Sequence, residues 1–257
     1  MDSISRLLPA GLLTGIFLTA TVPAKADIHS VDFDSAIASA ELLPSATVKQ
    51  SNSFSDVRDN YWAQPFVDAL ATNSYISGYS DGSFRPNQLL TRAEFAAMLS
   101  KAFVSAPAVK PASAAFKDVS GVAWALPAID FVESRGFMSG VGRGMFDPTS
   151  NISRVQVIVA LSSGLRLAPI DDTELFLSAN YTDLAQIPTW AYSQTTAATL
   201  SEIVINPLPV IMPTQMEPNR AATRAEVAAM VYQALVKENK IAPISAANPA
   251  TTHIVGF

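Results

Sequence analysis

Three stretches of the chain share a hydrophobic spacing that is typical of amphipathic helices. In each, apolar residues recur at positions i, i+3, i+4 and i+8, which lie on one face of an α-helix. The three sets are Phe95, Met98, Leu99 and Phe103; Val157, Ala160, Leu161 and Leu165; and Val227, Met230, Val231 and Leu235. Three equivalent apolar faces most simply pack against one another, so we predict a central three-helix bundle with near three-fold pseudosymmetry.

The same start signal precedes each apolar face. It reads Thr91-Arg92-Ala93-Glu94, Ser153-Arg154-Val155-Gln156 and Thr223-Arg224-Ala225-Glu226. A Thr or Ser with Glu or Gln three residues later forms a capping box, in which each side chain accepts a hydrogen bond from the other residue's backbone N–H. The chain is therefore expected to contain three copies of one unit, and such repetition decides most of the fold.

Upstream motifs confirm the repeat in the sequence. Each copy has an aromatic-x-Asp element, at Phe54–Asp56, Phe116–Asp118 and Tyr181–Asp183, followed by a Trp-Ala pair. The distance from tryptophan to capping box is 29 residues in the first two copies and 33 in the third, which therefore carries a four-residue insertion. Residues 60–70 predict a short first helix, with Pro65 in its first turn.

Between the two helices of a copy, glycines predict a tight turn. Gly78 and Gly82 mark this turn in the first copy, and Gly140 and Gly144 mark it in the second. The third copy has Asn206-Pro207-Leu208-Pro209 at this place. We therefore expect its turn to differ.

An arginine follows the N-cap in all three copies, although a capping box does not require it. A positive charge there opposes the helix dipole. One interpretation is a solvated arginine, or one paired with a nearby aspartate. The other is an anion pocket, in which free N–H groups of the helix end and a guanidinium fork hold a carboxylate.

The tryptophans and aspartates also leave two interpretations open. Each tryptophan either packs into the core at the start of a helix or provides a flat platform for a sugar ring. Asp56, Asp118 and Asp183 are at least as well suited to capping the first helix or pairing with an arginine as to touching a ligand.

Composition excludes several kinds of site. The chain has no cysteine, which excludes disulfides and thiolate metal sites. Its formal net charge of −5, without a basic tract, argues against nucleic-acid binding. Residues 1–26 combine an apolar run with an Ala24-Lys25-Ala26 cleavage site and predict a signal peptide, so we expect a secreted protein; an uncleaved anchor is the alternative. No later segment is apolar enough to span a membrane.

Together these motifs resemble the S-layer homology (SLH) repeat. The likeness extends over about residues 53–238 and predicts a domain organisation with repeats at 53–105, 115–168 and 180–238. A linker at 27–52 and a C-terminal tail at 239–257, both rich in Ala, Ser, Thr and Pro, are expected to be extended or disordered. The resemblance implies a mainly α fold, with three helix-loop-helix repeats around a central bundle.

The resemblance also implies a function, which is noncovalent anchoring to the cell envelope. The implied partner is a secondary cell-wall polymer, which in some relatives ends in a pyruvylated sugar, or a peptidoglycan-linked glycan, bound in grooves between repeats. No cofactor is implied. The groove candidates are Asp56, Trp62, Gly78 and Arg92; Asp118, Trp124, Gly140 and Arg154; and Asp183, Trp190 and Arg224. Without its glycine, the third groove is expected to bind weakly or to be purely structural, and Gln156 is expected to weaken a carboxylate-mediated contact in the second.

An enzyme and an assembly scaffold are the two alternatives to envelope anchoring. An enzyme is disfavoured because the two histidines, His29 and His253, lie in the tails, away from the repeats. Asp171 and Asp172 form an acidic pair that is better explained as a solvated loop than as a catalytic dyad. The stronger alternative is an assembly scaffold in the envelope that keeps the fold without sugar sites, with the tails recruiting protein partners.

Overall fold

The computed structural model describes residues 54–109 and 116–256. The predicted signal peptide and the whole of the predicted linker lie outside these residues, as does His29. The described part of the chain is helical and contains no β-strand, which confirms the mainly α fold class. No helix in this part is long and apolar enough to cross a membrane.

Each repeat contributes two helices. The first helices are α1 (Gln64–Thr72), α3 (Leu126–Ser134) and α6 (Tyr192–Leu200). The second helices are α2 (Arg92–Ala102), α4 (Arg154–Gly164) and α7 (Arg224–Lys237), and all three begin with the predicted capping box. Helix α1 starts at Gln64 rather than near Asn60, because Tyr61 to Ala63 form a turn ahead of Pro65.

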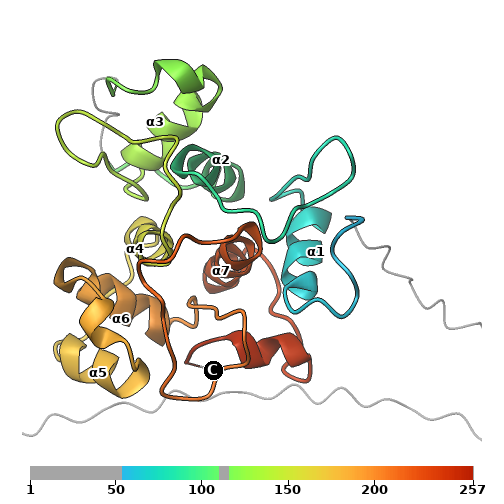
Figure 1. The fold of residues 1–257 in the computed structure, drawn as a ribbon, viewed down its shortest axis with the longest axis vertical. Helices are drawn as coiled ribbons and strands as arrows, with labels where there is room; N and C mark the ends of the chain where they lie inside the picture. Colours follow the sequence, from blue (N-terminus) through green and yellow to red (C-terminus); the bar gives the residue numbers. More distant parts are fainter. Residues whose placement is uncertain (1–53, 110–115, 257) are drawn as a thin grey trace, which may run out of the picture. The chain divides into compact units, whose positions relative to one another are not determined.

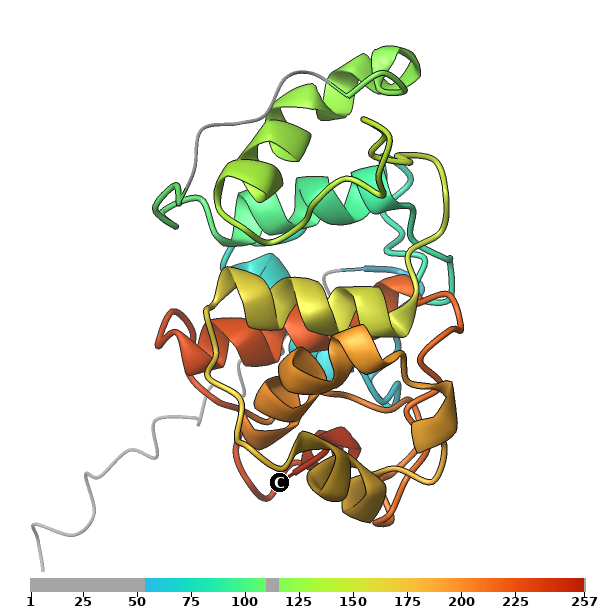
Figure 2. The same cartoon turned by 90° about the vertical axis from the view of Figure 1, so that its left-hand side faces the viewer.

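The second helices form the centre of the repeat domain. Helix α7 contacts both α2 and α4 (Figure 1). From the side, α2 lies above α4, and α7 runs alongside α4 (Figure 2). The predicted apolar faces are buried except at Leu165, which is half-buried. The predicted central bundle is confirmed.

The first helices pack in cyclic order around this bundle. Helix α3 of the second repeat packs on α2 of the first, α6 of the third packs on α4 of the second, and α1 packs on α7. Each first helix therefore covers the second helix of the preceding repeat, and the third repeat closes back onto the first.

Three backbone hydrogen bonds connect the three repeats in a cycle, just before the helices of the central bundle begin. The N–H of Leu90 donates to Ala222 O (3.1 Å), that of Ala222 to Ile152 O (2.9 Å), and that of Ile152 to Leu90 O (2.9 Å). All three side chains are fully buried. Because buried backbone groups need partners, this triangle sets the register of the three repeats against one another.

Several further elements complete the fold. Short 3-10 helices span Ser120–Ala125 (η1), Leu184–Gln186 (η2), Thr189–Ala191 (η3) and Pro249–His253 (η4). Helix α5 (Thr173–Asn180) packs on α6. It begins directly after Asp171 and Asp172, for which the sequence predicted a solvated loop. The tail prediction is wrong for the described C-terminal residues, because Ala250, Ile254 and Val255 are buried against the third repeat.

Candidate functional site

Two surface grooves share one construction. Groove 1 has a volume of about 330 Å³ and is lined by the turn Ser77–Tyr79, by Glu94 and Lys101 of α2, and by Trp124 and Arg224. Groove 2 has a volume of about 470 Å³. Its lining includes the equivalent turn Ser139–Val141, Gln156 and Ser163 of α4, Trp190 and Arg92.

Each groove combines side chains from all three repeats. In groove 1 the turn and α2 come from the first repeat, Trp124 from the second and Arg224 from the third. In groove 2 the same parts come from the second, third and first repeats. The tryptophan, glycine and arginine of one repeat, which the sequence grouped together, therefore lie in three different places around the ring.

Trp124 and Trp190 lie at the surface rather than in the core. Their exposed fractions are 61% and 60%, although most large apolar side chains around them are buried. They lie in η1 and η3, each just before the first helix of its repeat. The core-packing interpretation is therefore wrong for these two residues, and each indole borders its groove. Trp62 differs, because it is half-buried.

The arginines of grooves 1 and 2 bind backbone carbonyls of the next repeat. Arg92 donates from Nε to Phe146 O (2.9 Å) and from Nη2 to Ser139 O (3.0 Å). Arg224 donates from Nε to Phe84 O (2.8 Å) and from Nη2 to Ser77 O (3.3 Å). Burial lowers the pKa of both guanidinium groups. Both side chains are largely buried, and neither forms a salt bridge with an aspartate of the described residues.

The free N–H groups predicted at the helix ends are not free. The N–H groups of Arg92 and Ala93 donate to Ser150 O and Pro148 O, both at 2.9 Å. The N–H of Glu94 donates to Thr91 Oγ1. Helices α4 and α7 use carbonyls of the neighbouring repeat in the same way. This part of the anion-pocket prediction is wrong, because the inter-repeat contacts consume these donors.

One guanidinium nitrogen remains available in each groove. Nη1 of Arg92 and of Arg224 has no acceptor among the described residues, and neither atom is among the buried unpaired ones. Neither Nη1 atom is therefore fully buried, and each belongs to an arginine that lines its groove. An arginine held through Nε and Nη2 presents Nη1 in a set orientation, which suits an acidic or carbonyl oxygen of a ligand.

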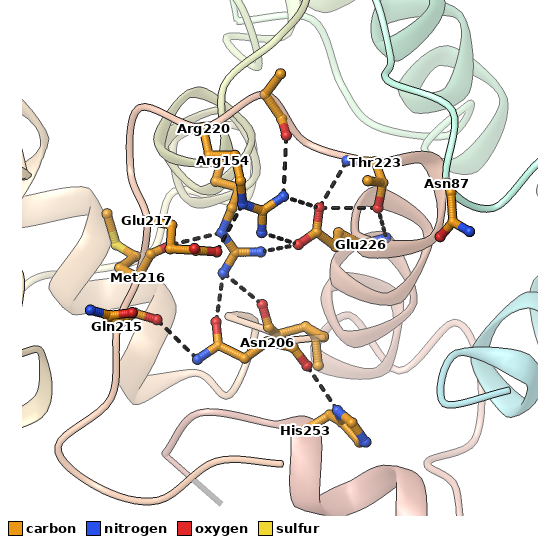
Figure 3. A network of polar contacts seen from close by, with 12 residues as sticks. Asn87, Arg154, Asn206, Gln215, Met216, Glu217, Arg220, Thr223, Glu226 and His253 are labelled. Atoms are coloured by element: carbon orange, nitrogen blue, oxygen red, sulfur yellow. Dashed lines mark hydrogen bonds and ion pairs between the residues drawn. The ribbon is translucent and has the colours of Figure 1, made fainter. Parts of the chain in front are cut away.

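Arg154, the equivalent arginine of the second repeat, reaches the turn of the third repeat and has no such free donor. Its Nη1 pairs with Glu226 Oε1 (2.9 Å), and its Nη2 donates to Asn206 Oδ1 (2.7 Å) and Ile205 O (2.9 Å) (Figure 3). Its exposed fraction is 0%. The prediction that Arg154 contacts a ligand conflicts with this structure, because the protein satisfies and covers its guanidinium group.

The three aspartates clamp the turns of their own repeats. Asp118 accepts hydrogen bonds from Phe146 N (2.9 Å) and Asp147 N (2.7 Å). Asp56 binds Phe84 N and Arg85 N in the same way, and Asp183 binds Met216 N and Glu217 N. The second residue of each pair has a positive φ, between 52° and 60°. The aspartates therefore hold a left-handed residue in place, rather than capping a helix or pairing directly with an arginine.

The turn glycines are needed for close packing. A Cβ on Gly140 would lie 2.6 Å from Phe116 Cε1 and 2.7 Å from Met145 O. Gly78 has the same neighbours in the first repeat, the ring of Phe54 and the carbonyl of Ser83. Each glycine thus lets the aromatic side chain of the aromatic-x-Asp element reach the turn. Both glycines also line their grooves.

The two grooves differ in charge. Groove 1 contains the cations Arg224 and Lys101 and the carboxylate of Glu94. The lining of groove 2 contains Arg92 and no carboxylate, because Gln156 stands where Glu94 stands in groove 1. The sequence missed the second lining residue on each helix, Lys101 in α2 and Ser163 in α4. Its signal is its position seven residues after the capping Glu or Gln, on the same helix face.

No group of three or more acidic or histidine side chains that would hold a metal ion occurs in the described part of the chain. Each groove presents an exposed indole, an arginine side chain and a close-packed glycine turn, and each is assembled from three repeats. These features make the two grooves the candidate binding sites of this repeat protein.

Comparison with known proteins identifies the module. Residues 53–96 and 115–158 match the family model of the S-layer homology domain. The first two repeats of this chain are therefore SLH domains, as the sequence motifs indicated.

Similar proteins include an exoglucanase, a cellulosome-anchoring protein and an S-layer protein. The chain is 30% identical over 200 residues to an exoglucanase, XynX, of Acetivibrio thermocellus, over 77% of this chain and 18% of that protein. It is 27% identical over 151 residues to a cellulosome-anchoring protein of the same species (58% and 32%). It is 30% identical over 178 residues to the S-layer protein sap of Bacillus anthracis (69% and 20%). The chain therefore covers less than a third of the length of each of these three relatives.

Proposed function

We propose that this protein anchors noncovalently to the cell envelope by binding an acidic glycan of the wall in grooves 1 and 2. The observation that carries the proposal is the repeated pairing of an exposed tryptophan with an arginine that lines the same groove and whose Nη1 has no acceptor among the described residues. The SLH match and the S-layer and cellulosome-anchoring relatives support it.

The chemistry of the two grooves suits a sugar that bears a carboxylate. The flat apolar face of an indole packs against the C–H face of a sugar ring. A guanidinium nitrogen beside it donates to a carboxylate with a strength about twice that of a neutral hydrogen bond. A secondary cell-wall polymer or a peptidoglycan-linked glycan would supply both features, and a secreted protein at the wall or in the periplasm would meet them.

Binding rather than catalysis is the activity we propose for the grooves. Among carboxylates and histidines, the lining of groove 1 contains Glu94, whose Oε2 already accepts hydrogen bonds from Thr91 N and Oγ1 (both 2.9 Å). The lining of groove 2 contains no carboxylate or histidine. The two grooves are built from equivalent residues, and a function common to both is therefore better explained by ligand binding than by general acid–base catalysis.

We propose further that the third repeat is a divergent SLH repeat. Its capping box, its Asp183 clamp and the reach of Arg154 into its turn repeat the geometry of the other two. The four extra residues lie in the turn, since Met216 follows Ile205 by 11 positions and Phe84 follows Ser77 by seven. The lengthened turn accounts for a weaker motif in an unchanged architecture.

A second function, docking of an envelope protein, is favoured by one observation. The lengthened turn exposes Leu208 by 75% and Ile211 by 83%. Contiguous exposed apolar side chains often mark an interaction surface. A scaffold of this kind would bind through the third repeat and would not require the tryptophans of grooves 1 and 2.

Sedimentation with purified wall sacculi tests the proposal. The protein should co-sediment with intact sacculi and should lose binding when the secondary polymers are removed. A Trp124→Ala/Trp190→Ala variant should bind far more weakly. Leu175→Ala is a matched control, because Leu175 is 70% exposed but lies on α5 outside both grooves. Binding that is lost equally in both variants, or in neither, would point to the protein-docking alternative.

A further inference from the structure

The third repeat has the parts of a groove, but the chain itself fills the space. By the construction of grooves 1 and 2, a third groove would lie between the turn at Asn206, helix α7, Arg154 and Trp62. The segment Pro249–Gly256, which contains η4, occupies this position.

Backbone hydrogen bonds join this segment to the third turn. Asn206 N donates to His253 O (2.9 Å) and Val255 N donates to Val204 O (2.8 Å). Ile205 and Ile254 form an antiparallel bridge between these bonds. Peptides often bind a protein by such strand-like pairing, in which main-chain bonds provide affinity and side-chain pockets provide specificity.

His253 occupies the place of a ligand against Trp62. The two rings stack with centroids 5.2 Å apart and an angle of 29° between their planes. The His253 ring nitrogen Nδ1 lies 2.9 Å from Asn206 O (Figure 3). His253 is only 7% exposed, and Trp62 is half-buried, whereas the equivalent Trp124 and Trp190 are 61% and 60% exposed.

The polar end of this third site is also filled from within. Nη1 of Arg154 donates to Glu226 Oε1, whereas Nη1 of Arg92 and of Arg224 has no acceptor among the described residues. Nη2 of Arg154 donates to Asn206 Oδ1. Asn206 stands where the other turns have Gly78 and Gly140, so the residue that removes the glycine also supplies the acceptor. The presence of Asn206 in place of glycine and the complete burial of Arg154 are therefore linked, because Asn206 accepts a hydrogen bond from this arginine.

We propose that the third groove is a peptide site whose occupant is the chain's own segment Pro249–Gly256, and that the module offers two glycan sites rather than three. The count of glycan sites rests on the proposed function; the peptide site does not. Because Trp62 belongs to the first repeat and Asn206 to the third, the segment also ties the two ends of the ring together.

Amide hydrogen exchange on the full-length protein tests the peptide site. In Trp62→Ala and in His253→Ala, exchange at Asn206 N–H and Val255 N–H should be at least tenfold faster than in the wild type. Trp124→Ala is the matched control and should leave both rates unchanged. His253→Phe should keep the slow rates, because a phenyl ring can stack on Trp62. Unchanged rates in both Trp62→Ala and His253→Ala would overturn the proposal.

Titration with soluble wall polymer released from sacculi tests the number of glycan sites. The wild type should bind at two sites per chain, Trp62→Ala also at two, and Trp124→Ala at one. Three sites in the wild type, or the loss of one site in Trp62→Ala, would contradict the proposal. An absence of any binding would instead count against the proposed function, and the exchange experiment would still decide whether the peptide site exists.

Discussion

Arg154 and Glu226 form an ion pair between the second and third repeats, with Nη1 2.9 Å from Oε1 and side-chain exposures of 0% and 1%. Burial lowers the pKa of Arg154, and the charge of Glu226 opposes that effect. Arg220 also binds Glu226, so one carboxylate serves two guanidinium groups (Figure 3). Removing Glu226 would leave the charge of Arg154 buried without compensation, and removing Arg154 would leave Glu226 with Arg220 as its one guanidinium partner.

We expect Arg154→Met to destabilise the fold by about 3–5 kcal/mol, the range for breaking a buried pair. Arg92→Met should cost less, about 1–3 kcal/mol, because Arg92 bonds only to neutral carbonyls. Urea unfolding of the two variants measures the difference. Equal losses would show that the Glu226 pair adds nothing beyond the carbonyl contacts.

Stability should fall steeply in acid because of Glu226. Burial acts to raise the pKa of Glu226, but the hydrogen bond from Arg220 and the charge of Arg154 outweigh it, so its pKa lies below the ordinary value of 4.5. A depressed carboxylate pKa contributes stability that is fully present above the unfolded pKa and is lost as pH falls through the folded pKa. Asp118 contributes in the same direction, because the N–H groups of Phe146 and Asp147 outweigh the effect of its burial and lower its pKa.

The test is urea unfolding at pH 6, 4.5 and 3. The free energy of unfolding should change little between pH 6 and 4.5 and drop below that. Glu226→Gln should be less stable at pH 6 and should show a flatter decline below pH 4.5. A variant as steep as the wild type would exclude Glu226 as a source of the acid sensitivity.

Gly140→Ala should destabilise the second repeat by about 1–3 kcal/mol, the usual cost of overpacking. The new Cβ would press against the Phe116 ring and the Met145 carbonyl. Gly121→Ala is a suitable control, because a Cβ there meets nothing within 4 Å. Thermal unfolding compares the two, and a neutral Gly140→Ala would show that the turn can move away from Phe116.

Gln156→Glu should weaken glycan binding in groove 2. A carboxylate at this position would repel an acidic glycan, and it would reproduce the position of Glu94 in groove 1, where Nη1 of Arg224 has no acceptor among the described residues. We expect a loss of up to about tenfold in affinity, or 1.4 kcal/mol. Calorimetric titration of Trp124→Ala, in which groove 1 is disabled, isolates the effect. Tighter binding would instead support the hypothesis that a carboxylate at this position contacts the ligand.

The sequence predicted correctly the features that depend on residues close together in the chain. Hydrophobic spacing and capping boxes act within one or two helical turns, so the starts of α2, α4 and α7 were predicted correctly. The partners of the arginines were not, because Arg92 reaches Ser139 across 47 positions and Arg224 reaches Ser77 across 147. Only the cyclic packing of the repeats brings these residues together.

The prediction of an extended or disordered C-terminal tail was wrong for a related reason. Its composition, rich in Ala, Ser, Thr and Pro, is typical of a tail without its own core. Its order comes from a surface that three other segments create, around Trp62, Asn206 and α7. The sequence did indicate that the third turn is unusual, through the loss of its glycine, but a local pattern contains no information about what would fill the space.

The most direct test of the account is the affinity of the Trp124→Ala/Trp190→Ala variant for wall sacculi, compared with the wild type at matched melting temperature. Because both indoles are exposed, their removal should leave the melting temperature almost unchanged. Loss of an aromatic anchor typically costs about 2 kcal/mol or more, so we predict a loss of affinity of at least about tenfold per groove. Wild-type affinity in this variant would contradict the assignment of grooves 1 and 2 as the sites that bind the wall.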